Sequence, residues 1–160
     1  MNQPMISVLF VCHGNICRSP MAEAVFQQMV NDAGLGDQIR ADSAGTIGYH
    51  AGETAHRGTL EVLRKHNIPY DGRSRKIKAS DFEAFDYVVT MDDNNLRNLR
   101  SMPTANANTR MFLSYANDAG TSTVREVPDP YYDGRFDYVY HLVKTGCEAL
   151  LAEIRKNHNL

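Results

Sequence analysis

A short segment near the N-terminus combines a thiol, small residues and an arginine. It reads Cys12-His13-Gly14-Asn15-Ile16-Cys17-Arg18-Ser19-Pro20. An apolar run at residues 6–11 precedes it, which is typical of a strand buried on both faces of a parallel sheet. Pro20 is suited to the first turn of a helix, where its missing N–H costs nothing. A loop that joins a strand to a helix in this way can bind an anion through its backbone N–H groups.

The residue types in this loop indicate which reaction the anion site would serve. Gly14 and Asn15 tolerate positive φ, which lets successive N–H groups point toward one centre. The same field favours a thiolate at Cys12, and Arg18 can hold two phosphate oxygens in a fixed fork. A nucleophilic thiolate, an anion cradle and a bidentate arginine together predict attack on the phosphorus of a phosphate ester.

Three other interpretations of these residues remain open from the sequence alone. Cys12 could be an inert core thiol, because free cysteine is among the most buried residue types. Cys12 and Cys17 could be a redox pair, although their separation is not the C-x-x-C of oxidoreductases. A metal site would need more ligands than Cys12 and His13 supply nearby, so no metal is expected. The phosphate-ester interpretation is favoured because strand, loop and helix all agree with it.

The leaving oxygen of a phosphate ester needs a proton as its bond to phosphorus breaks. Asp129 is the candidate donor, because a proline on either side stiffens its backbone and two adjacent tyrosines, Tyr131 and Tyr132, offer aromatic walls. The alternative is that Pro-Asp-Pro only forms a turn before the last helix. Asp92 and Asp93 are interpreted as helix-capping residues.

The elements that must position these residues alternate along the chain. Strands are expected at residues 6–11, 39–43, 87–91 and 111–113, helices at residues 19–33, 55–66, 81–85, 94–100 and 136–154, and a loop at residues 117–126. This alternation predicts a single three-layer α/β domain over residues 1–160, with helices on both faces of a parallel sheet. Such folds bind ligands at the carboxyl ends of their strands.

Length and composition agree with one soluble domain. The 160 residues are 42% hydrophobic and 22% charged, and the formal net charge of -2 gives no sign of nucleic-acid binding. No apolar window reaches the ~20 residues that a membrane helix needs, and no basic region typical of a secretory signal begins the chain. Three cysteines do not make a disulfide framework, which favours a cytoplasmic protein with reduced thiols.

The chain resembles the low-molecular-weight protein tyrosine phosphatases. The resemblance rests on residues 8–26, 42–46, 73–75, 85–92 and 129–132 and on the final helix, in the family's order and spacing. It implies a four-stranded parallel sheet with a phosphate-binding loop after the first strand. It also implies a cytoplasmic, metal-independent enzyme without a cofactor, which hydrolyses phosphotyrosine and small aryl phosphates through a phosphocysteine intermediate.

The resemblance implies roles for individual residues. Cys12 would be the nucleophile, Arg18 would grip the phosphoryl oxygens, and Asp129 would be first the acid and then the base. The implied substrate-binding residues are His13, Gly14, Asn15, Ile16, Cys17, Ser19, Tyr49, His50, Tyr131 and Tyr132. The implied loop supports are Asn15, Ser19 and Ser43. Cys17 would be the redox partner of Cys12 in a reversible disulfide.

Three positions depart from the family's usual pattern. His13 stands where Leu is more frequent, and His50 stands where some members have an acidic residue. Gly72 stands where a histidine tied to the loop asparagine is frequent, which leaves open how Asn15 is anchored.

The resemblance also implies partners and excludes two rival functions. Tyrosine-phosphorylated proteins, a cognate tyrosine kinase among them, would be the partners, and inorganic phosphate would be a product inhibitor. The protein would be a monomer or a weak homodimer, with no nucleic-acid or membrane partner. An arsenate reductase would need further cysteines, but residues 81–94 contain none and Cys147 lies on an apolar helix face. An inactive phosphotyrosine-binding module would have lost Cys12 or Asp129, and both are present.

Overall fold

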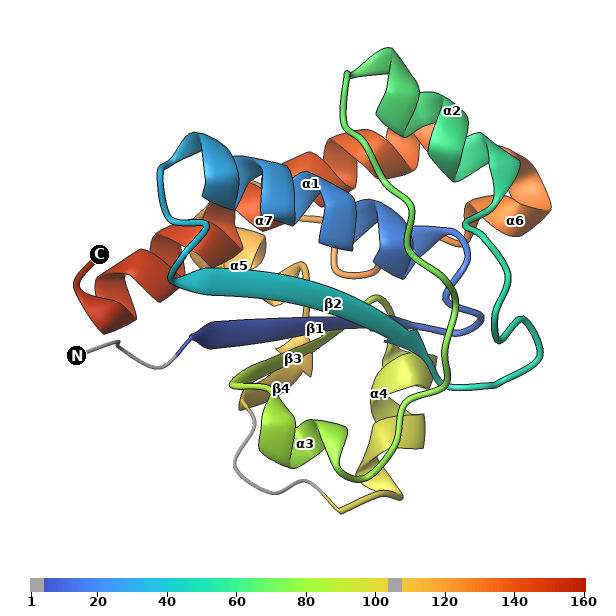
Figure 1. Cartoon of the computed structure of the whole chain (residues 1–160), viewed down its shortest axis with the longest axis horizontal. Coiled ribbons are helices and arrows are strands. Elements are labelled where there is room, and N and C mark those ends of the chain that lie inside the picture. Colours follow the sequence, from blue (N-terminus) through green and yellow to red (C-terminus); the bar gives the residue numbers. More distant parts are fainter. Residues whose placement is uncertain (1–4, 104–107) are drawn as a thin grey trace.

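The centre of the molecule is a parallel sheet. The computed structural model describes residues 5–103 and 108–160. Its strands are β1 (Ile6–Cys12), β2 (Ile39–Gly45), β3 (Tyr87–Thr90) and β4 (Asn108–Met111). They pair in the order β2-β1-β3-β4, and each neighbouring pair is parallel (Figure 1). The four-stranded parallel sheet that the sequence predicted is therefore confirmed.

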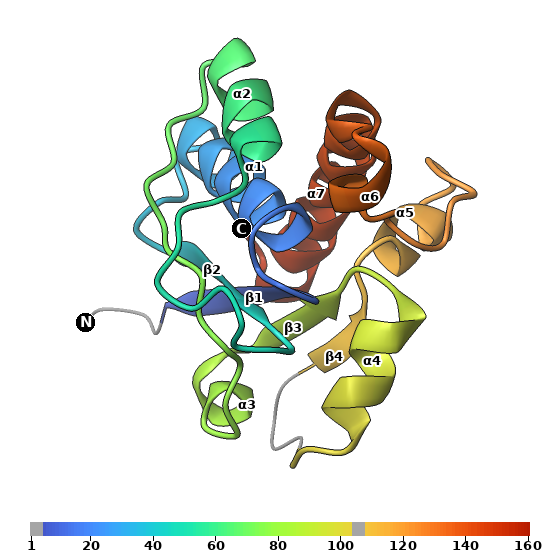
Figure 2. The same cartoon turned by 90° about the vertical axis from the view of Figure 1, so that its right-hand side faces the viewer.

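Helices cover both faces of this sheet. They are α1 (Arg18–Asp32), α2 (Arg57–Lys65), α3 (Asp81–Ala84), α4 (Asp93–Arg100), α5 (Ser114–Asp118), α6 (Pro130–Asp133) and α7 (Phe136–His158). In Figures 1 and 2, α1, α2, α5 and α7 lie on one side of the sheet and α3 and α4 on the other. This arrangement confirms the predicted three-layer α/β class. Within the described ranges, no helix is both long enough and apolar enough to cross a membrane.

The apolar run in β1 is buried on both faces because helices pack on each side of this central strand. Val8 and Phe10 join the larger core with α1 and α7, whereas Leu9 and Val11 join a smaller core with α3 and α4. All four of these side chains are 0% exposed. Burial on two faces removes the apolar–polar alternation of a half-exposed strand, which is why the run is nearly continuous.

Three of the expected element boundaries are wrong. The last strand is Asn108–Met111 rather than 111–113, because β4 is a polar edge strand and the apolar residues after it are core side chains leading into α5. Helix α5 occupies residues 114–118, the last two of which were expected to be loop. Helix α6 occupies residues 130–133, where no helix was expected and a turn was one of the interpretations.

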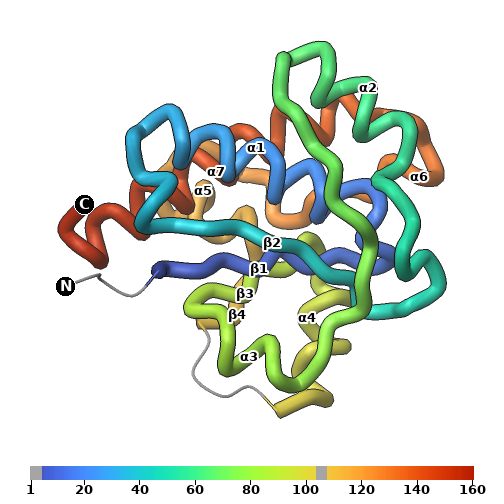
Figure 3. Tube along the Cα trace, in the orientation of Figure 1, coloured from blue at the N-terminus to red at the C-terminus, as the bar shows by residue number. Residues whose placement is uncertain are grey.

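The carboxyl ends of the parallel strands meet at one edge of the sheet, which faces the viewer in Figure 2. The segment between α2 and α3 returns across the molecule beside the end of β2 (Figure 3). Both backbone groups of Gly45 are hydrogen-bonded to this segment. Gly45 N donates to Arg75 O at 2.8 Å, and Gly45 O accepts from Ile77 N at 2.8 Å. Segments far apart in the chain are thus brought around the loop that follows β1.

Candidate active site

The phosphate loop, residues 12–18, has its carbonyl groups turned outward. Five of them accept hydrogen bonds from outside the loop: Cys12 from Thr46 N (2.9 Å), His13 from Ile47 N (3.1 Å), Gly14 from Ser74 Oγ (3.0 Å), Ile16 from His56 N (2.7 Å) and Cys17 from Thr59 Oγ1 (2.9 Å). Within the described part of the chain, the N–H groups of residues 13–17 have no acceptor. These N–H groups are therefore available to an anion.

Asn15 holds the turn of the loop. Its φ of 57° is in the left-handed region, which asparagine tolerates better than most residues. Its side chain donates to Ser19 Oγ at 2.7 Å and accepts from Arg75 N at 3.0 Å. The Arg75 guanidinium is fixed in turn by Asp81 at 2.9 Å and Asp42 at 3.2 Å. The backbone of Arg75 thus anchors Asn15, which answers the question that Gly72 left open.

Gly14 and Gly45 have no room for a side chain, and neither has a positive φ. The expectation of positive φ at Gly14 is wrong, since the described glycines with positive φ are others. A Cβ at Gly14 would instead lie 3.1 Å from His50 Cδ2. A Cβ at Gly45, at the end of β2, would lie 2.9 Å from His13 O. The sequence analysis did not single out Gly45, although it permits the close approach of β2 to the loop.

The thiol of Cys12 lies at the floor of the loop and is 2% exposed. Its Sγ is 3.0 Å from Ser19 Oγ. Because the Ser19 oxygen already accepts from Asn15, the hydroxyl proton of Ser19 is free to be donated to the sulfur. A charge-assisted bond of this kind stabilises a thiolate over a thiol.

Arg18 is held beside Cys12 by two acidic side chains and one carbonyl. Its Nη1 donates to Asp92 Oδ2 at 2.7 Å and to Val127 O at 3.0 Å, and its Nη2 lies 3.6 Å from Asp129 Oδ2. Burial lowers the pKa of Arg18, but Cys12, Asp92 and Asp129 together more than offset it, so the guanidinium stays charged. Asp92 was expected only to cap α4. It does so through Oδ1, which accepts from Asn95 N at 2.8 Å, while Oδ2 orients Arg18.

Asp129 faces the same space from the opposite side. It is the N-cap of α6, where its Oδ1 accepts from Tyr131 N at 3.1 Å. Its side chain remains 27% exposed, and its other oxygen is the one near Arg18. Asp129 therefore combines the two interpretations that the sequence left open, since it both forms a helix start and points toward the cleft.

These groups line one cleft. The cavity has a volume of about 170 Å³ and is lined by Cys12, His13, Gly14, Ile16, Cys17, Arg18, Ile47, His50, Asp129, Tyr131 and Tyr132. Ile47 was missed, because a single apolar residue in a loop carries no sequence signal. His50 is positioned by its Nδ1 contact of 2.8 Å with Glu53 Oε2. Among the described residues, no group of three or more His, Cys, Asp or Glu side chains is arranged to hold a metal ion.

The sequence profile described as low molecular weight phosphotyrosine protein phosphatase matches residues 7–160. The chain belongs to this family. It is 48% identical over 159 residues to the low molecular weight protein-tyrosine-phosphatase YfkJ of Bacillus subtilis, which covers 98% of this chain and 100% of that protein. It is 42% identical to the low molecular weight protein-tyrosine-phosphatase PtpA of Staphylococcus aureus, with 98% of each chain covered.

Solved structures of related proteins share the fold. The crystal structure of YfkJ has a TM-score of 0.93 at 47% identity, with 99% of each chain covered. A protein tyrosine phosphatase from Entamoeba histolytica has a TM-score of 0.88 at 34% identity, with 95% of this chain and 98% of that chain covered. Similarity over the whole length thus extends to the segments that supply Arg18, Asp92 and Asp129.

In this family member, two of the expected site residues lie elsewhere. Tyr49 is 83% exposed and is outside the cleft lining, where its ring contacts the edge of His50 at a centroid distance of 4.9 Å. Ser43 does not bond to the loop within the described residues. Its hydroxyl donates to Glu23 Oε1 at 2.6 Å, because β2 carries it toward α1. Tyr70 donates to the same oxygen at 2.9 Å.

The second loop cysteine is a buried thiol. Cys17 is 2% exposed and lines the cleft together with Cys12. Burial, with the charges of Asp129 and Cys12, raises the pKa of the Cys17 thiol to about 12. Near neutral pH it is therefore protonated, so the site contains one candidate nucleophile rather than two.

Proposed function

We propose that this protein hydrolyses phosphotyrosine in proteins, and small aryl phosphates, in two steps through a phosphocysteine intermediate. One observation carries the proposal. The Arg18 guanidinium, the Asp129 carboxyl and a loop whose N–H groups at residues 13–17 have no acceptor among the described residues line one cleft together with Cys12. That arrangement supplies a nucleophile, an anion cradle and an acid around one phosphoryl group.

In the first step the Cys12 sulfur attacks phosphorus and the bond from phosphorus to the ester oxygen breaks. Arg18 and the loop N–H groups stabilise the charge on the three non-bridging oxygens. Asp129 gives its proton to the departing phenolic oxygen, which leaves as a phenol.

In the second step water attacks the phosphocysteine, and Asp129 removes a proton from that water. The sulfur–phosphorus bond breaks, and Cys12 leaves as a thiolate that accepts the hydroxyl proton of Ser19 in a hydrogen bond. The product, inorganic phosphate, fits the same cradle, so we expect it to inhibit.

The walls of the cleft favour an aromatic ester. Tyr131, Tyr132 and His50 line it, and the edge of the Tyr131 ring lies against His56 at a centroid distance of 5.7 Å. A flat phenyl ring can pack between such walls, whereas the short chain of phosphoserine offers them little contact. We therefore propose tyrosine-phosphorylated proteins, including a cognate tyrosine kinase, as substrates. The free cysteines fit a reducing cytoplasm, and we propose a monomer or weak homodimer.

Trapping the intermediate tests the mechanism. Acid quench during turnover of a ³²P-labelled aryl phosphate, followed by peptide mapping, should place the label on Cys12. Cys12→Ser should bind phosphate but show no turnover, because a neutral hydroxyl replaces the thiolate. A label on another residue, or a Ser variant with a tenth of wild-type kcat (about 1.4 kcal/mol of barrier), would overturn the assignment.

Substitution of Asp129 tests the acid. Asp129→Asn should slow phosphoenzyme formation by about 10²–10⁴ for a leaving group that needs a proton, and much less for one that departs as its anion. Rapid-quench kinetics over aryl phosphates of graded leaving-group pKa measures this difference. An equal, small loss across the series would make Asp129 only the cap of α6.

A further inference from the structure

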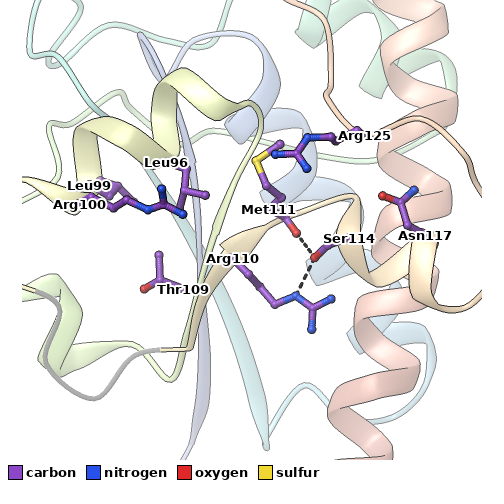
Figure 4. A pocket seen from close by; sticks show the side chains of 9 residues that line it. All are labelled: Leu96, Leu99, Arg100, Thr109, Arg110, Met111, Ser114, Asn117 and Arg125. Carbon is purple, nitrogen blue, oxygen red and sulfur yellow. Dashed lines mark hydrogen bonds between the residues drawn. The ribbon is translucent and has the colours of Figure 1, made fainter.

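A second cavity, of about 570 Å³, lies outside the cleft along the free edge of β4 (Figure 4). It is bounded by α4, β4, α5 and the segment that contains Arg125. Its cationic lining is Arg100, Arg110 and Arg125, and its apolar lining is Leu96, Leu99 and Met111. We call it the arginine cavity. None of its lining residues belongs to the cleft.

The guanidinium groups of this cavity form only exposed ion pairs with the described residues. Arg110 pairs with Asp118, whose side chain is 75% exposed, and Arg125 pairs with Asp93, whose side chain is 39% exposed. Neither acid lines the cavity, and exposed pairs of this kind are weak. Arg100 forms no ion pair with any described residue. An anion in the cavity would therefore meet two cations, Arg100 and Arg125, that can turn toward it at little cost.

Arg110 gives the cavity a fixed side. Its Nε donates to Ser114 Oγ at 2.7 Å (Figure 4). Its guanidinium lies over the Tyr115 ring at 3.9 Å from the centroid. A guanidinium held in this way presents its remaining N–H groups in a defined plane, which suits the oxygens of a phosphate. The volume is within the range of small-molecule sites, and the leucines and methionine suit a short hydrocarbon group.

The same cavity is connected to the catalytic arginine. Arg125 is two residues before Val127, whose carbonyl accepts from Arg18 at 3.0 Å. Its partner Asp93 follows Asp92, whose carboxylate accepts from Arg18 at 2.7 Å. The Arg125–Asp93 pair thus joins the two segments that hold Arg18. A ligand that draws Arg125 away from Asp93 acts on both segments.

We propose that the arginine cavity is a regulatory site for a small organic phosphate, whose binding lowers turnover by loosening the support of Arg18. The regulatory part rests on the proposed function, whereas binding to the cavity does not. A free metabolite and a phosphorylated side chain share this chemistry, so both a small phosphonate and a phosphoserine peptide serve as probes.

Two measurements test the proposal. In ¹⁵N-labelled protein, butylphosphonate, whose carbon–phosphorus bond cannot be hydrolysed here, should produce saturable shifts at residues 96–100 and 109–114 with a Kd of about 1 mM or tighter. These shifts should be separate from those of residues 12–18. At saturating aryl phosphate, which keeps the probe out of the cleft, butylphosphonate should lower kcat by about twofold or more.

Matched variants on α4 locate the effect. Arg100→Gln should weaken the Kd by about fivefold or more and abolish the loss of kcat, while leaving hydrolysis without the probe unchanged. Arg97→Gln, on the same helix but outside the lining, should change neither quantity. If Arg100→Gln does not fold, Arg125→Gln provides a second variant for the binding measurement, and because it breaks the pair with Asp93 it should also lower kcat without the probe.

The outcomes separate the parts of the proposal. Shifts confined to residues 12–18, shifts near α4 that do not saturate, or equal binding by the Arg100 and Arg97 variants would overturn the site. Saturable binding without a change in kcat would overturn its regulatory role. A protein that binds the probe but hydrolyses no aryl phosphate would instead refute the proposed function. Tighter binding of the phosphoserine peptide would identify the phosphate source as a protein side chain.

Discussion

Asp92→Asn separates the contact that Asp92 makes with Arg18 from the role of Asp92 as the N-cap of α4. Asn is as good an N-cap as Asp, so Oδ1 can still accept from Asn95 N and α4 should keep its start. The amide NH₂ that replaces Oδ2, however, cannot accept from Arg18 Nη1, which now lies 2.7 Å from a carboxylate oxygen. The change therefore removes the orienting bond and leaves the cap.

The expected loss follows from the burial of this contact. Arg18 is 3% exposed and keeps Val127 O and Asp129 as partners. Removing one charge-assisted hydrogen bond costs roughly 1.5–3 kcal/mol. If that cost falls on the transition state, kcat/KM should drop by about 10- to 100-fold, with most of the loss in kcat.

Steady-state hydrolysis of an aryl phosphate, well below the Tm of each variant, measures this loss. The matched control is Asp137→Asn, which removes an exposed contact of 3.4 Å with Lys65 and should leave kcat/KM unchanged. If Asp92→Asn kept kcat/KM within about twofold of wild type, Val127 and Asp129 alone would suffice to place Arg18. A loss confined to Tm would show that the contact between Asp92 and Arg18 stabilises the fold without serving the reaction.

Three further predictions concern other groups around the loop. Ser19→Ala should slow phosphocysteine hydrolysis by about 10- to 100-fold, because the departing Cys12 sulfur loses its donor, and single-turnover kinetics should show the intermediate accumulating. Burial raises the pKa of Glu23 above its ordinary 4.5, so the folded protein holds the Glu23 proton more tightly than the unfolded chain does. The resulting contribution to stability is present below pH 4.5 and is lost as the pH rises through the raised pKa. The Tm of Glu23→Gln minus the Tm of wild type should therefore increase from pH 4 to pH 8. A difference that stays constant over this range would refute the prediction. After peroxide converts Cys12 to a sulfenic acid, Cys17 should condense with it and release water, faster at higher pH because its own pKa is about 12. Cys17→Ser should then recover less activity with dithiothreitol, and equal recovery would exclude the disulfide.

The parts of the site that the sequence predicted are those that local chemistry determines. The strand, the loop and the start of α1 are consecutive, so the relation of Cys12 to Arg18 is set by the spacing alone. Asp129 was found because two prolines and two tyrosines mark its segment, although it is far from the loop in sequence. The order of the strands does not follow from the residues alone, because alternation predicts parallel pairing without fixing which strands are neighbours.

The residues that the sequence analysis missed are brought to the loop by the order in which the strands pair. Asp92 has a sufficient local explanation as a helix cap, and only the pairing of β1 with β3 brings its second oxygen to Arg18. Gly45 and Arg75 support the loop because β2 and the chain after α2 lie beside it. Ser43 shows the reverse case. It matches a loop support by position, yet its hydroxyl bonds to Glu23.

The contact between Arg18 and Asp129 suggests how substrate binding readies the acid in the proposed mechanism. Without substrate, the two side chains are 3.6 Å apart, so the arginine attracts the carboxylate that must later carry a proton. A phosphoryl group held by Arg18 would place its own oxygens against the guanidinium and so free the Asp129 carboxyl group to face the leaving oxygen. The loop can impose this exchange because its carbonyl groups are already fixed outward before an anion arrives. Binding the dianion and releasing Asp129 from Arg18 would then be one coupled event rather than two independent requirements.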